Sequence, residues 1–283
     1  MQIACYGTGG HAQPIAVKML FMDRQQGNTL GITGIVDTHA HLCDPSFDGD
    51  LFLVLERARI AGISSVIAVG ETLEDGEKNL ALAKTYPQLL PAAGLYPTHL
   101  DLSAAHEVIT FIEKEQGRLV AIGEVGLDYW VIKEERQREI QREIFSGFIE
   151  LGKKLDLPLN VHSRSAGRHA IGLLLEKGAA RVQLHAFDGK ASTARPAVEA
   201  GYFFSIPPSI IRSRQKQKLV KNLPLSSILL ETDSPVLGPT PGERNEPVNA
   251  LVSLRAVSEI KGLSQEAVME AVIENTRRLY GYA

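Results

Sequence analysis

The sequence predicts a (β/α)8 barrel, and two observations predict it. A short apolar run followed by a longer amphipathic run recurs along the chain from residue 34. Alternation of this kind implies parallel strands joined by helices. Eight such units span about 250 residues, which is the size expected of a closed barrel, and the doubly wound sheet is the alternative.

The strands are expected where short apolar runs end in polar residues. Their predicted ranges are 34–42, 64–70, 89–97, 119–128, 157–164, 181–187, 201–207 and 226–235. Amphipathic runs between them predict helices, for example over 50–62 and 135–155. A final helix over 264–281 has Ser264 and Glu266 in a favourable N-terminal turn.

Composition limits the compartment and the partners of the chain. With 30 Lys and Arg against 33 Asp and Glu, the net charge of -3 gives no broad attraction to nucleic acid or to an anionic membrane. The two cysteines, Cys5 and Cys43, cannot form a disulfide framework. Neither a membrane-spanning run nor a secretion signal is present, so we expect an intracellular protein, cytoplasmic or nuclear.

The first 33 residues stand outside the barrel pattern and are treated as an unplaced N-terminal extension, which leaves residues 34–283 as one barrel domain. The Gly-rich stretch at 7–10 is followed by His11 and Ala12 instead of the Gly-Lys-Ser/Thr of a phosphate-binding loop. A basic stretch at 212–221 is expected on a solvated helix face, with contact to a DNA backbone as the alternative.

Two histidines mark the end of the first strand. Asp37, His39 and His41 are spaced two apart in "GIVDTHAHL", so their side chains project to one face. Residues that do chemistry in a barrel of this type sit at the carboxyl ends of the strands. Taken alone, the pair of histidines is equally compatible with a metal site and with ordinary packing.

The ends of other strands decide between those alternatives. Glu124 lies in the end of the fourth predicted strand close to Asp128, and Asp233 lies in the end of the eighth with Glu231 on the same face. Histidines end the fifth and sixth strands, at His162 and His185. Burying each of these groups unpaired would cost several kcal/mol, roughly 2–7 for a neutral polar group. Convergence on metal therefore explains the pattern better than unrelated buried hydrogen bonds.

The ligand types indicate which metals fit. Imidazole and carboxylate together suit Zn²⁺, Mn²⁺ or Fe²⁺ better than Mg²⁺, which stays an allowed alternative. Six ligands are too many for one open catalytic zinc. They fit two divalent cations that share a carboxylate, an arrangement that acidifies water and stabilises a phosphoester during displacement.

These motifs carry a family resemblance. In this order, the chain contains "DTHAHL", "GEVGLDY", "VHSRSAGR", "LHAFDG", "LETDSP", "RNEP" and "ENTRRLYG". From about residue 34 to 281 the sequence resembles the TatD family of metal-dependent deoxyribonucleases, within the amidohydrolase-like barrels, and looks most like a eukaryotic branch of that family.

The resemblance implies a role for each motif residue. It implies that His39 and His41 bind the first metal with Asp233, which also orients or deprotonates the attacking water. It implies a second metal on His162 and His185, with Glu124 bridging both. The implied reaction is hydrolysis of a DNA phosphodiester, an ester-bond hydrolase activity, with trimming from the 3′ end as one mode.

Two positions depart from the family pattern. Tyr96 in "GLYPTH" stands where a histidine is common, and His99 follows it in the same loop. Ser165 in "HSRSA" replaces an acid. Neither position is a predicted ligand, so these departures concern the substrate reaction more than metal binding.

Other residues near the strand ends are candidates for substrate binding. Arg164 could hold a phosphate with two hydrogen bonds or pair with Glu231 or Glu124.

Arg244 and Asn245 lie in the loop after the eighth strand, where substrate contact competes with a turn stabilised by the asparagine. Tyr129 and Trp130 could stack on a base or cover the barrel rim.

Two other functions are open on the same residues. A metal-dependent hydrolase of a small phosphoester or amide could use the same barrel site, since a fold hosts many chemistries. A non-catalytic protein with structural metals is disfavoured, because structural sites are closed by four ligands. No helix-turn-helix, zinc-finger or basic-arm signature is present. We expect DNA as the partner, no obligate protein partner and a monomer.

Overall fold

The computed structural model describes residues 34–281, which contain eight strands in one sheet. Neighbours in the chain are neighbours in the sheet, and the seven pairings from β1 to β8 are parallel. The strands are β1 (Ile35–Ala40), β2 (Ile63–Ala68), β3 (Leu89–Ala93), β4 (Ala121–Gly126), β5 (Leu159–His162), β6 (Val182–Leu184), β7 (Phe203–Ile206) and β8 (Ile228–Leu230).

The sheet closes at the carboxyl ends of β1 and β8. Asp233 N donates to His39 O and His41 N donates to Ser234 O, both at 2.8 Å. A parallel bridge joins Ala40 to Ser234 between these two bonds. The predicted (β/α)8 barrel is confirmed, and the doubly wound alternative is wrong.

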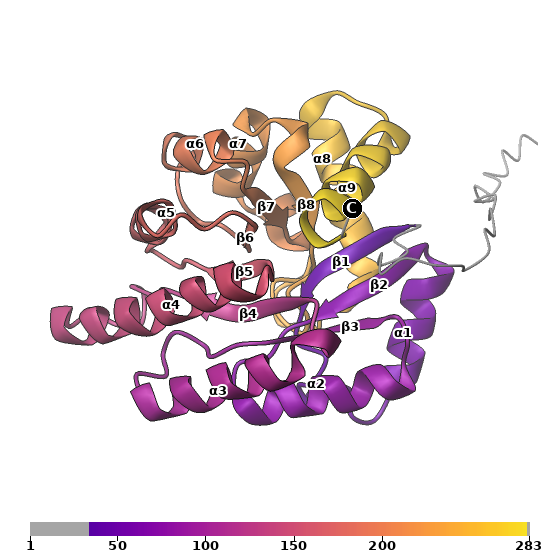
Figure 1. Cartoon of the computed structure of the whole chain (residues 1–283). Coiled ribbons are helices and arrows are strands. Elements are labelled where there is room, and N and C mark those ends of the chain that lie inside the picture. The colour runs from indigo at the N-terminus through magenta and orange to yellow at the C-terminus, as the bar shows by residue number, and fades with distance from the viewer. Residues whose placement is uncertain (1–33, 282–283) are drawn as a thin grey trace, which may run out of the picture.

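Helices follow the strands around the outside of the sheet, as Figure 1 shows. They are α1 (Leu51–Ile60), α2 (Leu73–Thr85), α3 (Leu102–Glu115), α4 (Glu135–Leu155), α5 (Gly167–Glu176), α6 (Ala191–Glu199), α7 (Arg214–Asn222), α8 (Ala250–Lys261) and α9 (Gln265–Tyr280). The predicted helix over 135–155 matches α4, whose buried Ile144, Phe145, Phe148 and Ile149 recur at the spacing of one helix face. The Ser264 side chain caps α9 by accepting from Ala267 N, as the sequence predicts.

The end of α9 closes the floor of the barrel. Figure 1 shows this yellow helix beside the indigo β1, which it contacts. Tyr280 is buried among apolar side chains of the strands, including Val36 and Phe203. Its hydroxyl donates to Gln183 Oε1 at 2.6 Å.

A chain of hydrogen bonds runs from this floor toward the other end of the barrel. Gln183 Nε2 donates to Ser205 Oγ at 2.8 Å, and Ser205 Oγ donates to Glu231 Oε2 at 2.5 Å. All three side chains are buried. Their polar atoms are therefore paired within the barrel, as buried polar groups require.

The predicted extension over 1–33 and its Gly-rich stretch at 7–10 lie outside the described residues. Within 34–281, no helix has both the length and the apolar character that crossing a membrane would need.

Candidate metal centre

The end of β1 supplies the first two donors. His39 is the fifth residue of this six-residue strand and is fully buried, because it points into the barrel. His41 follows two positions later on the same side, and 13% of its side chain is exposed. Below them, Asp37 accepts from Thr232 N at 2.8 Å and from its hydroxyl at 2.5 Å, which ties β1 to the segment after β8.

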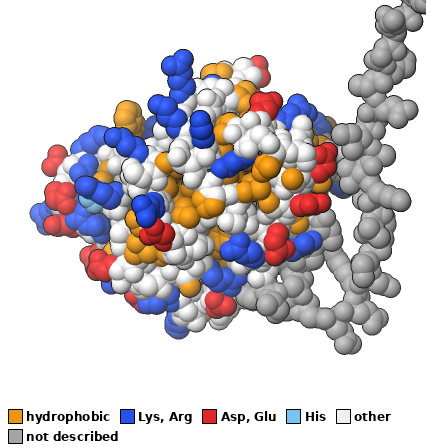
Figure 2. Space-filling view, turned by 90° about the horizontal axis from the view of Figure 1, so that it is seen from above, with side chains coloured by type: hydrophobic (Ala, Val, Ile, Leu, Met, Phe, Trp, Pro, Cys, Tyr) orange, Lys and Arg blue, Asp and Glu red, His pale blue; other side chains and the backbone are white. Residues whose placement is uncertain are grey.

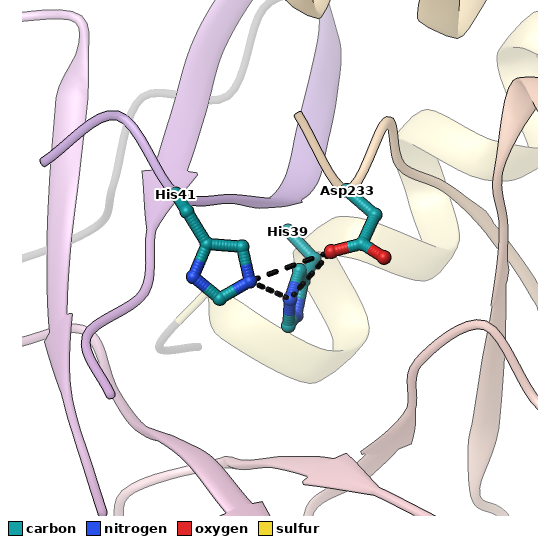
Figure 3. Close-up of side chains that lie close together, drawn as sticks. All are labelled: His39, His41 and Asp233. Atoms are coloured by element: carbon teal, nitrogen blue, oxygen red, sulfur yellow. Dashed lines mark hydrogen bonds and ion pairs between the residues drawn. The ribbon is translucent and has the colours of Figure 1, made fainter. Parts of the chain in front are cut away.

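The first cluster joins both histidines to Asp233. His39 Nε2 and His41 Nε2 lie 3.2 Å apart, and each lies 3.4 Å from Asp233 Oδ1, as Figure 3 shows. Glu124 Oε2 lies 3.5 Å from the first ring nitrogen and 3.3 Å from the second. Four ligands at the usual zinc bond lengths of about 2.0–2.1 Å would stand roughly 3.3–3.4 Å apart in a tetrahedron. The donor set therefore fits a divalent cation in both chemistry and spacing.

The second cluster uses the other oxygen of the same carboxylate. Glu124 Oε1 lies 2.5 Å from His162 Nδ1 and 2.8 Å from His185 Nε2. These two ring nitrogens are 3.1 Å apart. All three side chains are buried and form a second group that could hold a metal. The two groups meet at Glu124, whose oxygens face different histidine pairs.

Close backbone packing brings Glu124 to this position. Glu124 N donates to Gly70 O at 2.9 Å, and Gly70 N donates to Gly123 O at 3.2 Å. A Cβ on Gly94 would run into the Glu124 carbonyl oxygen, and one on Gly123 would lie 2.6 Å from Asn160 Cβ. Only glycine allows the strands to approach so closely here, which explains the "GEVG" and "AAGL" motifs.

Two of the histidines are oriented by tight contacts on their outer nitrogens. Asn160 Oδ1 lies 2.8 Å from His39 Nδ1, and its amide nitrogen donates to Thr38 O. The amide oxygen is therefore the acceptor, so His39 Nδ1 carries a hydrogen and Nε2 is free to bind a cation. Asp128 Oδ2 lies 3.2 Å from His162 Nε2 and orients that ring in the same way.

The other two histidines have looser outer contacts. His41 Nδ1 lies 3.9 Å from Glu71 Oε1. The buried His185 Nδ1 has no hydrogen-bond partner within residues 34–281, and Glu231 Oε2 lies 3.9 Å from it. Each ring nevertheless has a carboxylate on the side away from the clusters.

Backbone conformation adds to the positioning of two of these donors. Asp233 has a φ of +56°, and Ala186, directly after His185, has a φ of +42°. Residues other than glycine rarely adopt this left-handed backbone conformation. Such strain persists only where the surrounding structure enforces it. Both positions belong to the ends of strands that carry donors.

Mutual pairing of acids and bases controls the charge of the centre. Burial raises the pKa of Glu124, but His185 and His162 outweigh it and hold that pKa well below its usual range. Burial lowers the pKa of His41 and of His162, but the adjoining carboxylates outweigh it and raise these values to about 10 and about 9. Burial and the neighbouring His39 lower the pKa of His185 to about 4. In the metal-free chain, the negative charge of Glu124 and the positive charges of His41 and His162 therefore stabilise one another.

The structure brings together the six predicted ligand residues: His39, His41, Glu124, His162, His185 and Asp233. It does not bring Arg164 to them. The expectation that Arg164 shares the face of His162 is wrong, because β5 ends at His162 and the alternation of faces ends there too. Arg164 is exposed and lies over the Trp130 ring, so neither predicted ion pair with Glu231 or Glu124 forms.

Tyr129 is buried instead of open to a base. Its hydroxyl accepts from Arg142 at 2.9 Å, and Arg138 lies over its ring at 4.3 Å from the centroid. The structure therefore favours the rim-covering alternative for Tyr129 over base stacking. Trp130 is the exposed member of this pair of aromatic residues.

The two residues predicted in the loop after β8 are engaged within the protein. Arg244 forms two hydrogen bonds to Asp50, at 2.8 and 2.6 Å. Asn245 is buried and donates to Thr232 O and Val236 O, while its oxygen accepts from Glu246 N. The loop-stabilising alternative holds for Asn245, and substrate contact by Arg244 stays a prediction.

Sequence reasoning named Asp128 and Glu231 but missed two other residues beside the histidine rings, Asn160 and Glu71. Asn160 stands two positions before His162 in "LNVH", so the same alternation that placed the histidine could have found it. Glu71 follows β2 and was also missed; its carboxylate lies 3.9 Å from His41 Nδ1 and forms, with His41 and Glu124, a further group that could hold a metal. Lys216, expected on a solvated face, is buried and donates to Ala186 O at 2.7 Å.

A profile of the family described as TatD related DNase matches residues 36–281. The chain belongs to the TatD-related DNase family. This confirms the predicted resemblance. Human deoxyribonuclease TATDN3 is 48% identical over 259 residues, which are 87% of this chain and 94% of the human protein.

More distant TatD proteins agree with this assignment. The uncharacterized metal-dependent hydrolase YabD of Bacillus subtilis is 31% identical, covering 87% of this chain and 98% of its own. The crystal structure of the TatD homolog YjjV from Escherichia coli superimposes with a TM-score of 0.81 at 30% identity, covering 88% and 98% of the two chains. This TatD chain is therefore a metal-dependent hydrolase that acts on ester bonds.

Proposed function

We propose that this chain is a deoxyribonuclease that hydrolyses DNA phosphodiester bonds with two divalent cations. One observation carries the proposal: the two oxygens of Glu124 face two separate histidine pairs, at 3.3–3.5 Å and at 2.5–2.8 Å. A carboxylate shared in this way is what a bridged pair of cations requires. The names of relatives such as human deoxyribonuclease TATDN3 support DNA as the substrate.

In this proposal the ligands form two groups that share Glu124. His39, His41 and Asp233 would hold the first cation, His162 and His185 would hold the second, and Glu124 would serve both. Bound Zn²⁺ or Mn²⁺, with Mg²⁺ as the allowed alternative, would lower the pKa of water and offset charge on the phosphate oxygens.

Asp233 and the outer residues prepare the site for the reaction. Burial raises the pKa of Asp233, but its contacts with His39 and His41 outweigh it and keep the carboxylate ionised. Asp233 can therefore orient the attacking water and accept its proton. Asn160 and Asp128 hold the rings so that the donors meet without reorganisation.

A second candidate is hydrolysis of a small phosphoester or amide at the same centre. The net charge of -3 favours it, since DNA binding usually draws on an excess of basic residues. Figure 2 shows a face on which basic and acidic side chains are interspersed around hydrophobic ones. A small substrate would not need a continuous basic surface.

Metal restoration tests the proposal. The purified chain is stripped with chelator and assayed on end-labelled single- and double-stranded DNA after Zn²⁺, Mn²⁺ or Mg²⁺ is restored. We expect metal-dependent cleavage that Glu124→Ala abolishes and that Glu143→Ala, an exposed carboxylate on α4, preserves. The label also reports whether cleavage starts at the 3′ end. Two bound metals without DNA cleavage would overturn the deoxyribonuclease assignment and favour the small-substrate candidate.

The predicted monomeric state and the cytoplasmic or nuclear location stay predictions.

A further inference from the structure

An exposed tryptophan stands beside the second cluster. Trp130 is 57% exposed, although its neighbour Tyr129 is buried. It is the single tryptophan of the chain. A large aromatic ring left in water on a rigid loop is a common mark of a binding surface.

Hydrogen bonds fix the loop that carries Trp130, and this loop begins at Asp128, which contacts His162. Asp128 also accepts from Val131 N at 2.8 Å. Lys133 Nζ donates to Tyr129 O at 3.1 Å, so this bond joins a residue after Trp130 in the chain to the residue before it. The position of Trp130 is therefore tied to a residue that orients a ligand histidine.

Pairing between the loops after β4 and β5 sets how far the ring stands from the centre. Leu127 N donates to His162 O, and Tyr129 N donates to Arg164 O, both at 3.0 Å. The two residue steps from His162 to Arg164 span at most about 7 Å of chain, a length that one nucleotide can bridge. A strand cut at the metal centre can thus bring a neighbouring base to Trp130.

Two basic side chains flank the Trp130 ring. Lys133 Nζ and Arg164 Cζ each lie 5.2 Å from the centroid of the Trp130 ring. Within residues 34–281 neither side chain has an ion-pair partner, so both charges are available to an anion. Proteins that bind single strands combine these two features, an aromatic face for the base and cations for the backbone.

We propose that Trp130, flanked by Lys133 and Arg164, stacks on a nucleobase adjacent to the scissile phosphodiester. This inference rests on the proposed deoxyribonuclease function and names a residue that recognises its substrate. The partner is a DNA base with an open face, because a base inside a duplex is stacked on both sides. Lys133 and Arg164 contact the flanking phosphates.

The fluorescence of Trp130 reports the stacking directly, because no other tryptophan contributes. The metal-loaded full chain is titrated with a short single-stranded oligonucleotide whose phosphorothioate linkages resist hydrolysis. We expect saturable quenching, and no quenching by an oligonucleotide of the same length built from abasic units. Equal quenching by both would overturn the proposal, since the abasic strand has phosphates and no bases.

Kinetics of variants separate this proposal from the function on which it rests. Trp130→Ala should lower kcat/KM for a base-bearing oligonucleotide roughly tenfold, mainly through KM, and Trp130→Phe should restore most of the loss. The preference for the base-bearing over the abasic strand should shrink by the same factor. Phe52→Ala, which removes an aromatic ring of similar exposure from α1, serves as the matched control.

The outcomes are distinguishable. A wild-type chain that cleaves the base-bearing strand no better than Trp130→Ala overturns the stacking proposal and leaves the deoxyribonuclease intact. A wild-type chain that cleaves no DNA overturns the proposed function, whatever the fluorescence shows.

Discussion

Glu231 and Lys216 hold the same residue, Ala186, from its two sides. Glu231 Oε1 accepts from Ala186 N at 2.8 Å, and Lys216 Nζ donates to Ala186 O at 2.7 Å. Ala186 has left-handed backbone geometry and directly follows His185. The two buried charges therefore fix the strand end that presents a donor of the second cluster.

Loss of Lys216 should destabilise the fold. Burial raises the pKa of Glu231 to about 7 even with the lysine nearby. Lys216→Met removes the donor to Ala186 O and a positive charge that partly offsets the buried Glu231, and leaving a buried acceptor unsatisfied costs about 1–3 kcal/mol. Urea unfolding measures the change, and Lys218→Met on the exposed side of α7 is the control. Equal stability of both variants would show that the hydrogen bond from Lys216 to Ala186 O does not stabilise the fold.

Asn160 should tune metal affinity without being a ligand. Its oxygen accepts from His39 Nδ1–H at 2.8 Å and so keeps Nε2 free for the cation. Removing a partner of this kind typically weakens metal binding by about 10–100-fold. We expect this loss for Asn160→Ala in a chelator competition assay, with a far-UV circular dichroism spectrum like that of the wild type.

The matched control is Asn222→Ala at the exposed end of α7. An Asn160→Ala chain that binds metal as tightly as this control would contradict the orienting role.

Metal binding should release protons and strengthen as the pH rises. In the metal-free chain the pKa values of His41 and His162 are raised to about 10 and about 9, so both rings carry a proton at pH 7.5. A cation must displace these protons, so its apparent affinity should increase up to about pH 10. Calorimetry in buffers of different ionisation enthalpy counts the protons released. A count of zero at pH 7.5 would refute the raised values.

The same groups should make the metal-free chain less stable in alkali. The folded pKa of His41 lies above the ordinary value of 6.5, so its contribution is fully present below pH 6.5 and is lost as the pH rises through about 10. His162 acts in the same direction through about 9. We therefore expect the free energy of unfolding of the metal-free protein, kept free of metal by chelator, to fall between pH 7 and 10. Urea titration measures it. A flat or rising profile over that range would contradict the prediction.

The sequence predicts the barrel and its ligands for one physical reason. Alternation along a strand places His39 and His41 on one face, and parallel strands bring their carboxyl ends to one end of the barrel. The same rule fails for Arg164, because the alternation stops where β5 stops. Contacts such as Asn160 with His39 join residues 121 apart, so they depend on the register of the closed barrel and not on local spacing. The burial of Tyr129 likewise depends on Arg142, a residue of α4.

Arg244 offers the last test, because its contacts argue against a direct substrate role. Its guanidinium forms two hydrogen bonds with Asp50, one with Ser46 O and one with Glu246 Oε1, and the bonds to Asp50 and Ser46 tie the loop after β8 to the segment before α1. If Arg244 acts by holding this loop, Arg244→Ala and Asp50→Asn should lower kcat/KM for DNA by similar factors. We expect both factors to stay below about tenfold, since exposed ion pairs contribute little.

The double variant distinguishes the two roles of Arg244. Residues that form one link are not additive, so Arg244→Ala with Asp50→Asn should be no worse than either change alone. A direct phosphate contact predicts a different pattern. Asp50→Asn would then preserve kcat/KM, while Arg244→Ala would raise KM by itself.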